Sequence, residues 1–212
     1  MIKNQRNYEN LTKCRFAGVG KYEIPQIQPE QFEECEFIGF NFATSCEKAE
    51  RRMTGIHFFV DDYQFQRVWG MPDYYLPLLK QFKCVMTPDF STYADFPLAL
   101  QIYNHYRKHW VGAYLQLHGI KIIPTISWSD EASYEWCFDG EPVNSVVAIS
   151  SVGTGINPRS SELFMQGYQE MIKRLQPTQI IFYGHVPKAC QGNIVKITAF
   201  QEKFRKAVCD GW

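Results

Sequence analysis

The chain has 212 residues, of which 45% are hydrophobic and 21% charged, and this ordinary globular composition excludes a disordered, collagen-like or coiled-coil protein. Lys and Arg together number 22, as do Asp and Glu, so no overall field attracts nucleic acid or anionic lipid. The length is enough for one core of ordinary size, and we therefore expect a single domain.

Residues 1–35 contain clusters of Gly, Pro and Glu without a periodic pattern, and they are predicted to form an irregular N-terminal arm. From residue 36 to residue 212, short apolar runs alternate with amphipathic segments. The runs are continuous and rich in β-branched and aromatic residues, which is typical of strands buried on both faces of a parallel sheet. They occupy residues 36–41, 56–62, 83–89, 121–128, 145–151 and 179–184, and residues 193–197 form a candidate last strand.

The amphipathic segments predict the helices. Residues 97–118 and 161–175 carry apolar side chains at spacings of three and four, whereas residues 73–82 form a weaker pattern and residues 202–206 a short one. In the first of these segments Arg107, Lys108 and His109 fall outside the apolar stripe, so amphipathic geometry favours a solvated face over a nucleic-acid contact. A patch of Arg107, Lys108 and Lys121 would have to bind nucleic acid alone, which the zero net charge disfavours.

The alternation of strands and helices predicts a single α/β domain of about six mainly parallel strands. Polar residues end every strand rather than the strands at one switch point, which favours a small or incomplete β/α-barrel-like arrangement. A flavodoxin-like open sheet is the alternative.

Four aspartates follow the predicted strands, at the edge where parallel sheets bind their ligands. Asp61 and Asp62 follow the second run, Asp89 the third and Asp130 the fourth. These carboxylates could perform general acid–base catalysis, or could hold a divalent metal such as Mg²⁺ through oxygen ligands. Because neighbouring strand residues point to opposite faces, only one of Asp61 and Asp62 needs to face the site. Each aspartate could instead cap the helix that follows it.

The other strand ends offer groups that could bind a ligand. The loop with Ser151, Gly153 and Gly155 precedes a helix, and its small residues let backbone N–H groups approach an anion, although it could equally be a flexible loop that ends at Pro158. Trp128 offers a ring that can stack on a sugar or a base. The remaining candidate ligand-binding residues are Asn41, Ser91 and His185.

The sequence lacks the G-x-S-x-G, H-E-x-x-H, P-loop and G-x-G-x-x-G motifs, which disfavours serine hydrolases, zincins, kinases and dinucleotide-binding enzymes. Two functions remain open. The first is an enzyme, such as a hydrolase, that acts on a nucleotide or another phosphorylated or sugar-bearing small molecule. The second is a non-catalytic module that binds a nucleotide or a host protein in the same cleft.

Cysteine usage and the lack of apolar segments indicate the compartment. The seven cysteines include no C-x-x-C pair, which favours reduced thiols, with Cys84 and Cys137 as small core residues. No stretch approaches the roughly 18 apolar residues that span a bilayer, and the N-terminus has no apolar signal region. We expect a cytoplasmic protein that makes no membrane contact.

Several blocks of the sequence resemble a family described as a domain of unknown function in bacteria, phages and mobile elements. The blocks are residues 57–63, 87–93, 123–128, 137–140 and 167–168 with 170–171, of which the Asp-Asp-Tyr and Pro-Asp-Phe-Ser-x-Tyr blocks are the most specific. The likeness extends from about residue 10 to residue 197. It implies a protein of phage or plasmid origin in the bacterial host cell, such as a replication accessory, a nucleotide-handling enzyme or an antagonist of host defence, and it implies no particular reaction.

Overall fold

Two parallel sheets form the centre of the molecule in the computed structural model, which describes residues 10–200. An isolated parallel bridge between Thr125 and Ala148 joins the two sheets, so each strand neighbours the next one along the chain. The first sheet consists of β3 (Glu36–Gly39), β4 (Thr54–His57), β5 (Cys84–Met86) and β6 (Ile122–Ile123), and the second of β7 (Val146–Ser150), β8 (Gln179–Tyr183) and β9 (Ile194–Ile197).

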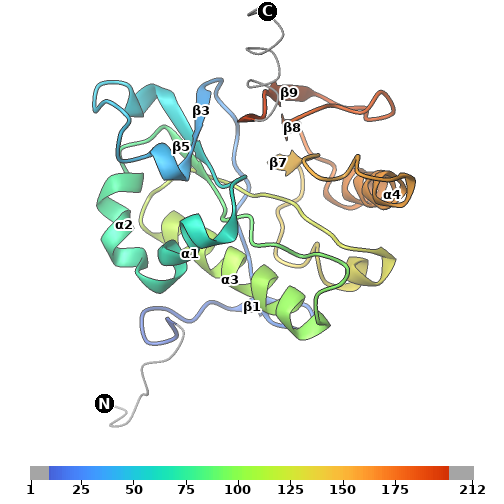
Figure 1. Cartoon of the computed structure of the whole chain (residues 1–212). Coiled ribbons are helices and arrows are strands. Elements are labelled where there is room, and N and C mark those ends of the chain that lie inside the picture. The colour runs from blue at the N-terminus through green and yellow to red at the C-terminus, as the bar shows by residue number, and fades with distance from the viewer. Residues whose placement is uncertain (1–9, 201–212) are drawn as a thin grey trace, which may run out of the picture.

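The helices pack beside these sheets. In Figure 1 the first three α-helices gather next to the first sheet, and the fourth lies beside the second. The α-helices are α1 (Asp62–Gly70), α2 (Pro72–Leu79), α3 (Leu98–Leu117) and α4 (Pro158–Leu175), and the 3-10 helices are η1 (Phe40–Phe42), η2 (Arg51–Met53) and η3 (Glu131–Glu135). Within residues 10–200, none of the helices combines the length and the apolar character that crossing a bilayer requires.

The structure confirms the predicted α/β class with mainly parallel strands. Each predicted apolar run overlaps a strand, and residues 193–197 contain the last one, β9; β4 begins at Thr54, two residues before the predicted run 56–62. The strand order follows the chain, as it does in β/α barrels, and differs from the 2-1-3-4-5 order of flavodoxin-like sheets. Over the described residues the strands do not close a barrel, so the arrangement is an incomplete one. The helix predicted at 202–206 lies outside the described residues.

Residues 10–35, the described part of the predicted arm, include a short antiparallel pair, β1 (Gly18–Val19) and β2 (Ile24–Pro25). Ile24 and Ile27 are fully buried, and Ile27 belongs to the core of the first sheet. Burial of a side chain of this size stabilises the fold by roughly 1.5–3 kcal/mol, so the arm contributes to the core. The division of the chain at residue 35 remains a prediction.

The prediction that Arg107, Lys108 and His109 form a solvated face of α3 was wrong. Arg107, Lys108 and His109 are only 9%, 1% and 0% exposed. The Lys108 ammonium donates hydrogen bonds to the Thr125 carbonyl and to Glu141 Oε1, both at 2.7 Å, and the Arg107 guanidinium lies 3.7 Å from the centre of the Phe90 ring. These side chains face the interior because other parts of the chain cover α3 on its polar side as well. They are therefore not available as a surface patch for nucleic acid.

Cys84 and Cys137 are buried, as predicted, and the cysteines of the described residues are free thiols. Cys84 begins β5 in the core of the first sheet, and Cys137 belongs to the core between the second sheet and α4. Both therefore act as small apolar residues.

Candidate functional site

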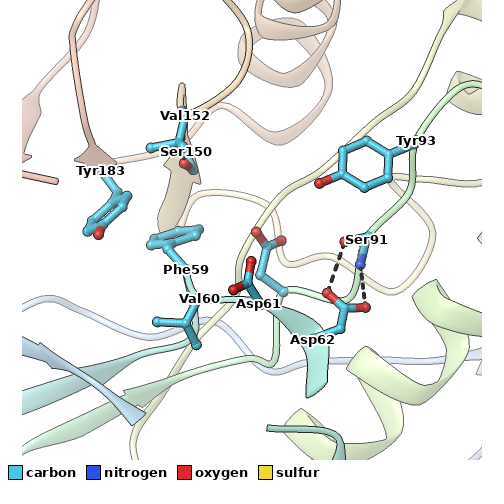
Figure 2. Close-up of a pocket in the computed structure, with 10 residues that line it drawn as sticks. Phe59, Val60, Asp61, Asp62, Ser91, Tyr93, Ser150, Val152 and Tyr183 are labelled. Atoms are coloured by element: carbon cyan, nitrogen blue, oxygen red, sulfur yellow. Dashed lines mark hydrogen bonds between the residues drawn. The ribbon is translucent and has the colours of Figure 1, made fainter. Parts of the chain in front are cut away.

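A pocket of about 220 Å³ lies at the carboxyl ends of four strands, β4, β5, β7 and β8 (Figure 2). The segments that follow these strands are brought together because parallel strands end at the same edge. The pocket is lined by Phe59, Val60, Asp61, Asp62, Asp89, Ser91, Tyr93, Ser150, Val152 and Tyr183.

Asp61 and Asp62 reach the pocket from the start of α1. β4 ends at His57, Asp61 is the N-cap residue of α1, and Asp62 is its first residue. The prediction that only one of the two needs to face the site rested on a strand that continues to residue 62, and in the structure both line the pocket. Asp62 accepts hydrogen bonds from the Ser91 backbone N–H at 3.1 Å and from the Ser91 hydroxyl at 2.9 Å, which fixes its direction (Figure 2).

Asp89 is a carboxyl group of the pocket whose ionisation is altered by its surroundings. It follows Pro88 after the end of β5 and is partly buried. Burial raises the pKa of Asp89 to about 7, the nearby Lys108 ammonium opposes this rise, and the negative charge of Asp62 adds to it. A carboxyl group with this pKa is protonated about half of the time at neutral pH, so it can both donate and accept a proton.

Aromatic rings border the carboxylates on two sides. Phe59 stacks on Tyr183 with ring centres 5.0 Å apart, and His57 lies against Tyr183 at 4.8 Å. Figure 2 shows Phe59 and Tyr183 on one side of the aspartates and Tyr93 on the other. Tyr93 is 61% exposed, so its ring is accessible from solvent. The pocket thus combines acceptor oxygens with flat apolar surfaces, to which a planar base or the apolar face of a sugar ring can bind.

Four of the predicted site residues line this pocket: Asp61, Asp62, Asp89 and Ser91. Two others have structural partners elsewhere. Asp130 caps η3 by accepting a hydrogen bond from the Ser133 N–H at 3.2 Å, and Trp128 packs on Phe164 while its indole N–H donates to the Leu163 carbonyl at 3.2 Å.

The remaining predicted residues also lie outside the ten lining residues. The Ser151 hydroxyl donates to the His185 carbonyl at 2.7 Å, which ties the loop after β7 to the end of β8. Gly153 and Gly155 are exposed, with open space where a Cβ would lie. Asn41 belongs to η1, and its buried Oδ1 has no hydrogen-bond partner. A binding role for these residues remains a prediction.

Sequence reasoning did not select the apolar part of the lining, which consists of Phe59, Val60, Tyr93, Val152 and Tyr183. The sequence prediction rested on polar residues at strand ends, and Trp128 was the one aromatic residue that it included. Two features of the sequence could have indicated these aromatic walls. Aromatic residues are in surplus, at 16% of the chain, and Phe59 and Tyr183 lie within two residues of strand ends.

These features define a class of protein, an incomplete β/α arrangement with a carboxylate-lined pocket at the strand ends. The particular family follows from sequence comparison: the model of the family described as Domain of unknown function (DUF4417) matches residues 16–201, and the chain belongs to this family. The chain is 39% identical over 174 residues to the Gene 1 protein of Mycobacterium phage L5, a match that covers 82% of this chain and 76% of the relative. It is 34% identical over 203 residues to the Gene 1 protein of Mycobacterium phage D29, with 94% and 75% covered.

No solved structure matches the chain. The family resemblance predicted from the sequence blocks is confirmed, and the homologues show that this is a phage-associated protein. The family description and the names of these relatives specify no reaction.

Proposed function

We propose that the protein is an enzyme that acts on a sugar-bearing small molecule, such as a nucleotide, by general acid–base catalysis in this pocket. The observation that carries the proposal is Asp89, whose pKa of about 7 occurs beside two further carboxylates in a pocket with aromatic walls. As a phage-associated protein, the enzyme would work in the cytoplasm of the bacterial host.

The three carboxylates have separate roles in this proposal. Protonated Asp89 donates its proton to the leaving group, which makes bond cleavage easier. Asp61 is exposed to solvent and accepts a proton from the attacking water, whose oxygen forms the new bond. Asp62 is held by Ser91 and keeps negative charge near Asp89, which favours the protonated form of Asp89. The reaction class is therefore a hydrolysis.

The lining also bears on the substrate. The ten lining residues include three aspartates and no Lys, Arg or His, so a bare phosphate would be repelled at the centre of the pocket. Sugar hydroxyl groups can donate hydrogen bonds to the carboxylates, and a base can stack on Tyr93 or Phe59. A phosphate group would point outward, toward the loop after β7, or would be bridged to an aspartate by a divalent ion such as Mg²⁺.

The proposal is tested by incubating the protein with a pool of nucleosides, nucleotides and sugar phosphates, with and without Mg²⁺, followed by mass spectrometry of bound and altered compounds. We expect one class of compound to be hydrolysed, with a rate that changes through an inflection near pH 7. Asp89→Asn should lower the rate at least about 100-fold, the typical contribution of one acid–base group.

Asp95→Asn is the matched control, because Asp95 is an exposed aspartate in the segment that follows Asp89 and does not line the pocket. Equal rates for Asp89→Asn and the wild type would contradict the proposal. A compound that is bound in the pocket but returned unchanged would instead establish the alternative function, a non-catalytic nucleotide-binding module. If the pool yields neither turnover nor binding, the small-molecule function is wrong, and a host protein becomes the partner to seek.

A further inference from the structure

A second cluster of titratable side chains lies in the interior, and none of its members lines the pocket. His105 and His109 are one turn apart on the same face of α3, and Glu141 follows the segment after η3. One ligand atom from each of the three lies within 4.8 Å of the other two, and among residues 10–200 no other group of His, Cys, Asp or Glu meets this criterion. The three residues are 1%, 0% and 5% exposed.

Backbone carbonyl groups determine which nitrogen of each histidine carries a proton. His105 Nε2 lies 3.0 Å from the Asp139 carbonyl oxygen, and His109 Nδ1 lies 2.9 Å from the Pro25 carbonyl oxygen. A carbonyl oxygen only accepts, so both of these nitrogens donate an N–H. In a neutral imidazole the other nitrogen then carries a lone pair. Histidines that bind metals are oriented in this way, with the second nitrogen donating to a carbonyl or carboxylate oxygen.

The protein supplies too few hydrogen-bond donors for the acceptor atoms of the cluster. His105 Nδ1 and Glu141 Oε2 are buried without a hydrogen-bond partner. His109 Nε2 lies 2.9 Å from Glu141 Oε1, and two acceptors at this distance need either a proton or a metal ion between them. A buried acceptor without a partner costs roughly 1–3 kcal/mol, so a native protein rarely keeps several of them together without a ligand.

Lys108 limits which metal the cluster can bind. Its ammonium group donates to Glu141 Oε1 at 2.7 Å, so this oxygen is shared between Lys108 and an ion, whereas Oε2 has no partner in the protein. The nearby positive charge weakens the binding of hard cations, which depend on several carboxylate oxygens. Two neutral imidazoles and one carboxylate oxygen suit Zn²⁺ or a similar late transition metal.

We propose that His105, His109 and Glu141 bind a divalent transition-metal ion, with Zn²⁺ as the favoured ion. The ion would link α3 to the residues after η3. The same histidines donate to carbonyl groups of Pro25 and Asp139, so metal binding would also hold the N-terminal arm and the segment before Glu141 in place. The ion therefore stabilises the fold, and none of its three ligands lines the pocket.

The test begins with the wild-type full chain, produced in zinc-supplemented medium and purified without chelator. Elemental analysis should find stoichiometric zinc. Treatment with a chelator should lower the melting temperature, and Zn²⁺ should restore it while Mg²⁺ should not. Co²⁺ added to the stripped protein should give the visible absorption bands of a site with nitrogen ligands.

Two variants locate the site. His105→Gln should reduce the zinc content to background, whereas His118→Gln should retain it, because His118 lies at the end of α3 outside the cluster. If His105→Gln does not fold, the measurements on the wild-type protein still decide the question. Wild-type protein that carries no zinc, and whose melting temperature does not respond to chelator, Zn²⁺ or Co²⁺, would overturn the proposal. Equal zinc loss in His118→Gln would overturn the assignment of the ligands.

Discussion

Replacing Asp89 by Asn removes a carboxyl group whose ionised form the folded protein disfavours, and this has a measurable effect on stability. A rise of its pKa from the ordinary value of 3.8 to about 7 corresponds to ~4 kcal/mol against the ionised form in the folded state. Because Asp89 is only partly buried, solvent in the pocket reduces this cost, and we expect about 2–4 kcal/mol in practice.

The sign of the effect depends on pH. Below about pH 4 the carboxyl group is protonated in both the folded and the unfolded chain, so its ionisation does not affect stability. Between about pH 4 and about pH 7 the unfolded chain ionises while the folded chain remains protonated, so rising pH favours unfolding. Above about pH 7 the full cost is present. Asp89→Asn should therefore gain stability relative to the wild type as the pH rises from about 4 to about 8.

The measurement is urea denaturation of the wild type, Asp89→Asn and the control Asp95→Asn across this pH range. The two variants should differ little at about pH 4, and Asp89→Asn should be the more stable by a few kcal/mol at about pH 8. If the stability difference between Asp89→Asn and the wild type is the same at every pH, Asp89 titrates like an exposed aspartate. The acid–base proposal would then lose the observation on which it rests.

Three further substitutions test the packing and capping of α4 and the buried ion pair of α3 by chemical denaturation. Gly167→Ala should cost about 1–3 kcal/mol, because the new methyl group would lie 2.1 Å from the Trp128 indole nitrogen, and a neutral result would show that Trp128 is free to move. Asn157→Ala should cost about 1 kcal/mol by removing the N-cap of α4, and an unchanged midpoint would mean that the cap contributes nothing. In metal-free protein, Lys108→Met should cost about 3–5 kcal/mol by leaving Glu141 buried without its lysine partner. Lys108→Met with Glu141→Gln should recover part of that loss, so a purely additive double variant would contradict the coupling.

The strands were predictable because burial on both faces leaves a clear trace in the sequence. β7 reads Val-Val-Ala-Ile-Ser, and its first four residues are all buried, as expected for the interior of a parallel sheet. The ends of the strands were not predictable from the same trace. Residues 56–62 form one continuous pattern, but the strand ends at His57, and α1 begins at Asp62. Hydrophobic runs show which residues are buried, not where the backbone leaves the sheet.

The carboxylate side of the pocket could be found from chain order, but its far side could not. Asp62 and Asp89 follow β4 and β5, which are direct neighbours in the sheet, so the rule that ligands bind at strand ends places them together. Tyr183 also ends a strand, β8, but β8 belongs to the second sheet, so chain order alone does not place it next to the carboxylates of the first sheet. Its ring centre lies 4.8 Å from that of His57 because the two sheets lie side by side, joined at the bridge between Thr125 and Ala148, and this placement is a property of the whole packing.

The error on α3 shows why the interior cluster was hidden from the sequence. A run of His, Arg, Lys and His next to an apolar stripe is typical of a solvated helix face, and this interpretation assumes that only one side of the helix is covered. Burying Lys108 requires a counter-charge, and its partner Glu141 lies 33 residues away in a segment with no helical or strand pattern of its own. Proteins usually depart from simple patterning where a group is kept for a purpose other than stability. Two features of this chain depart from simple patterning: the raised pKa of Asp89, and the buried polar face of α3. They coincide with the two places where we propose a ligand.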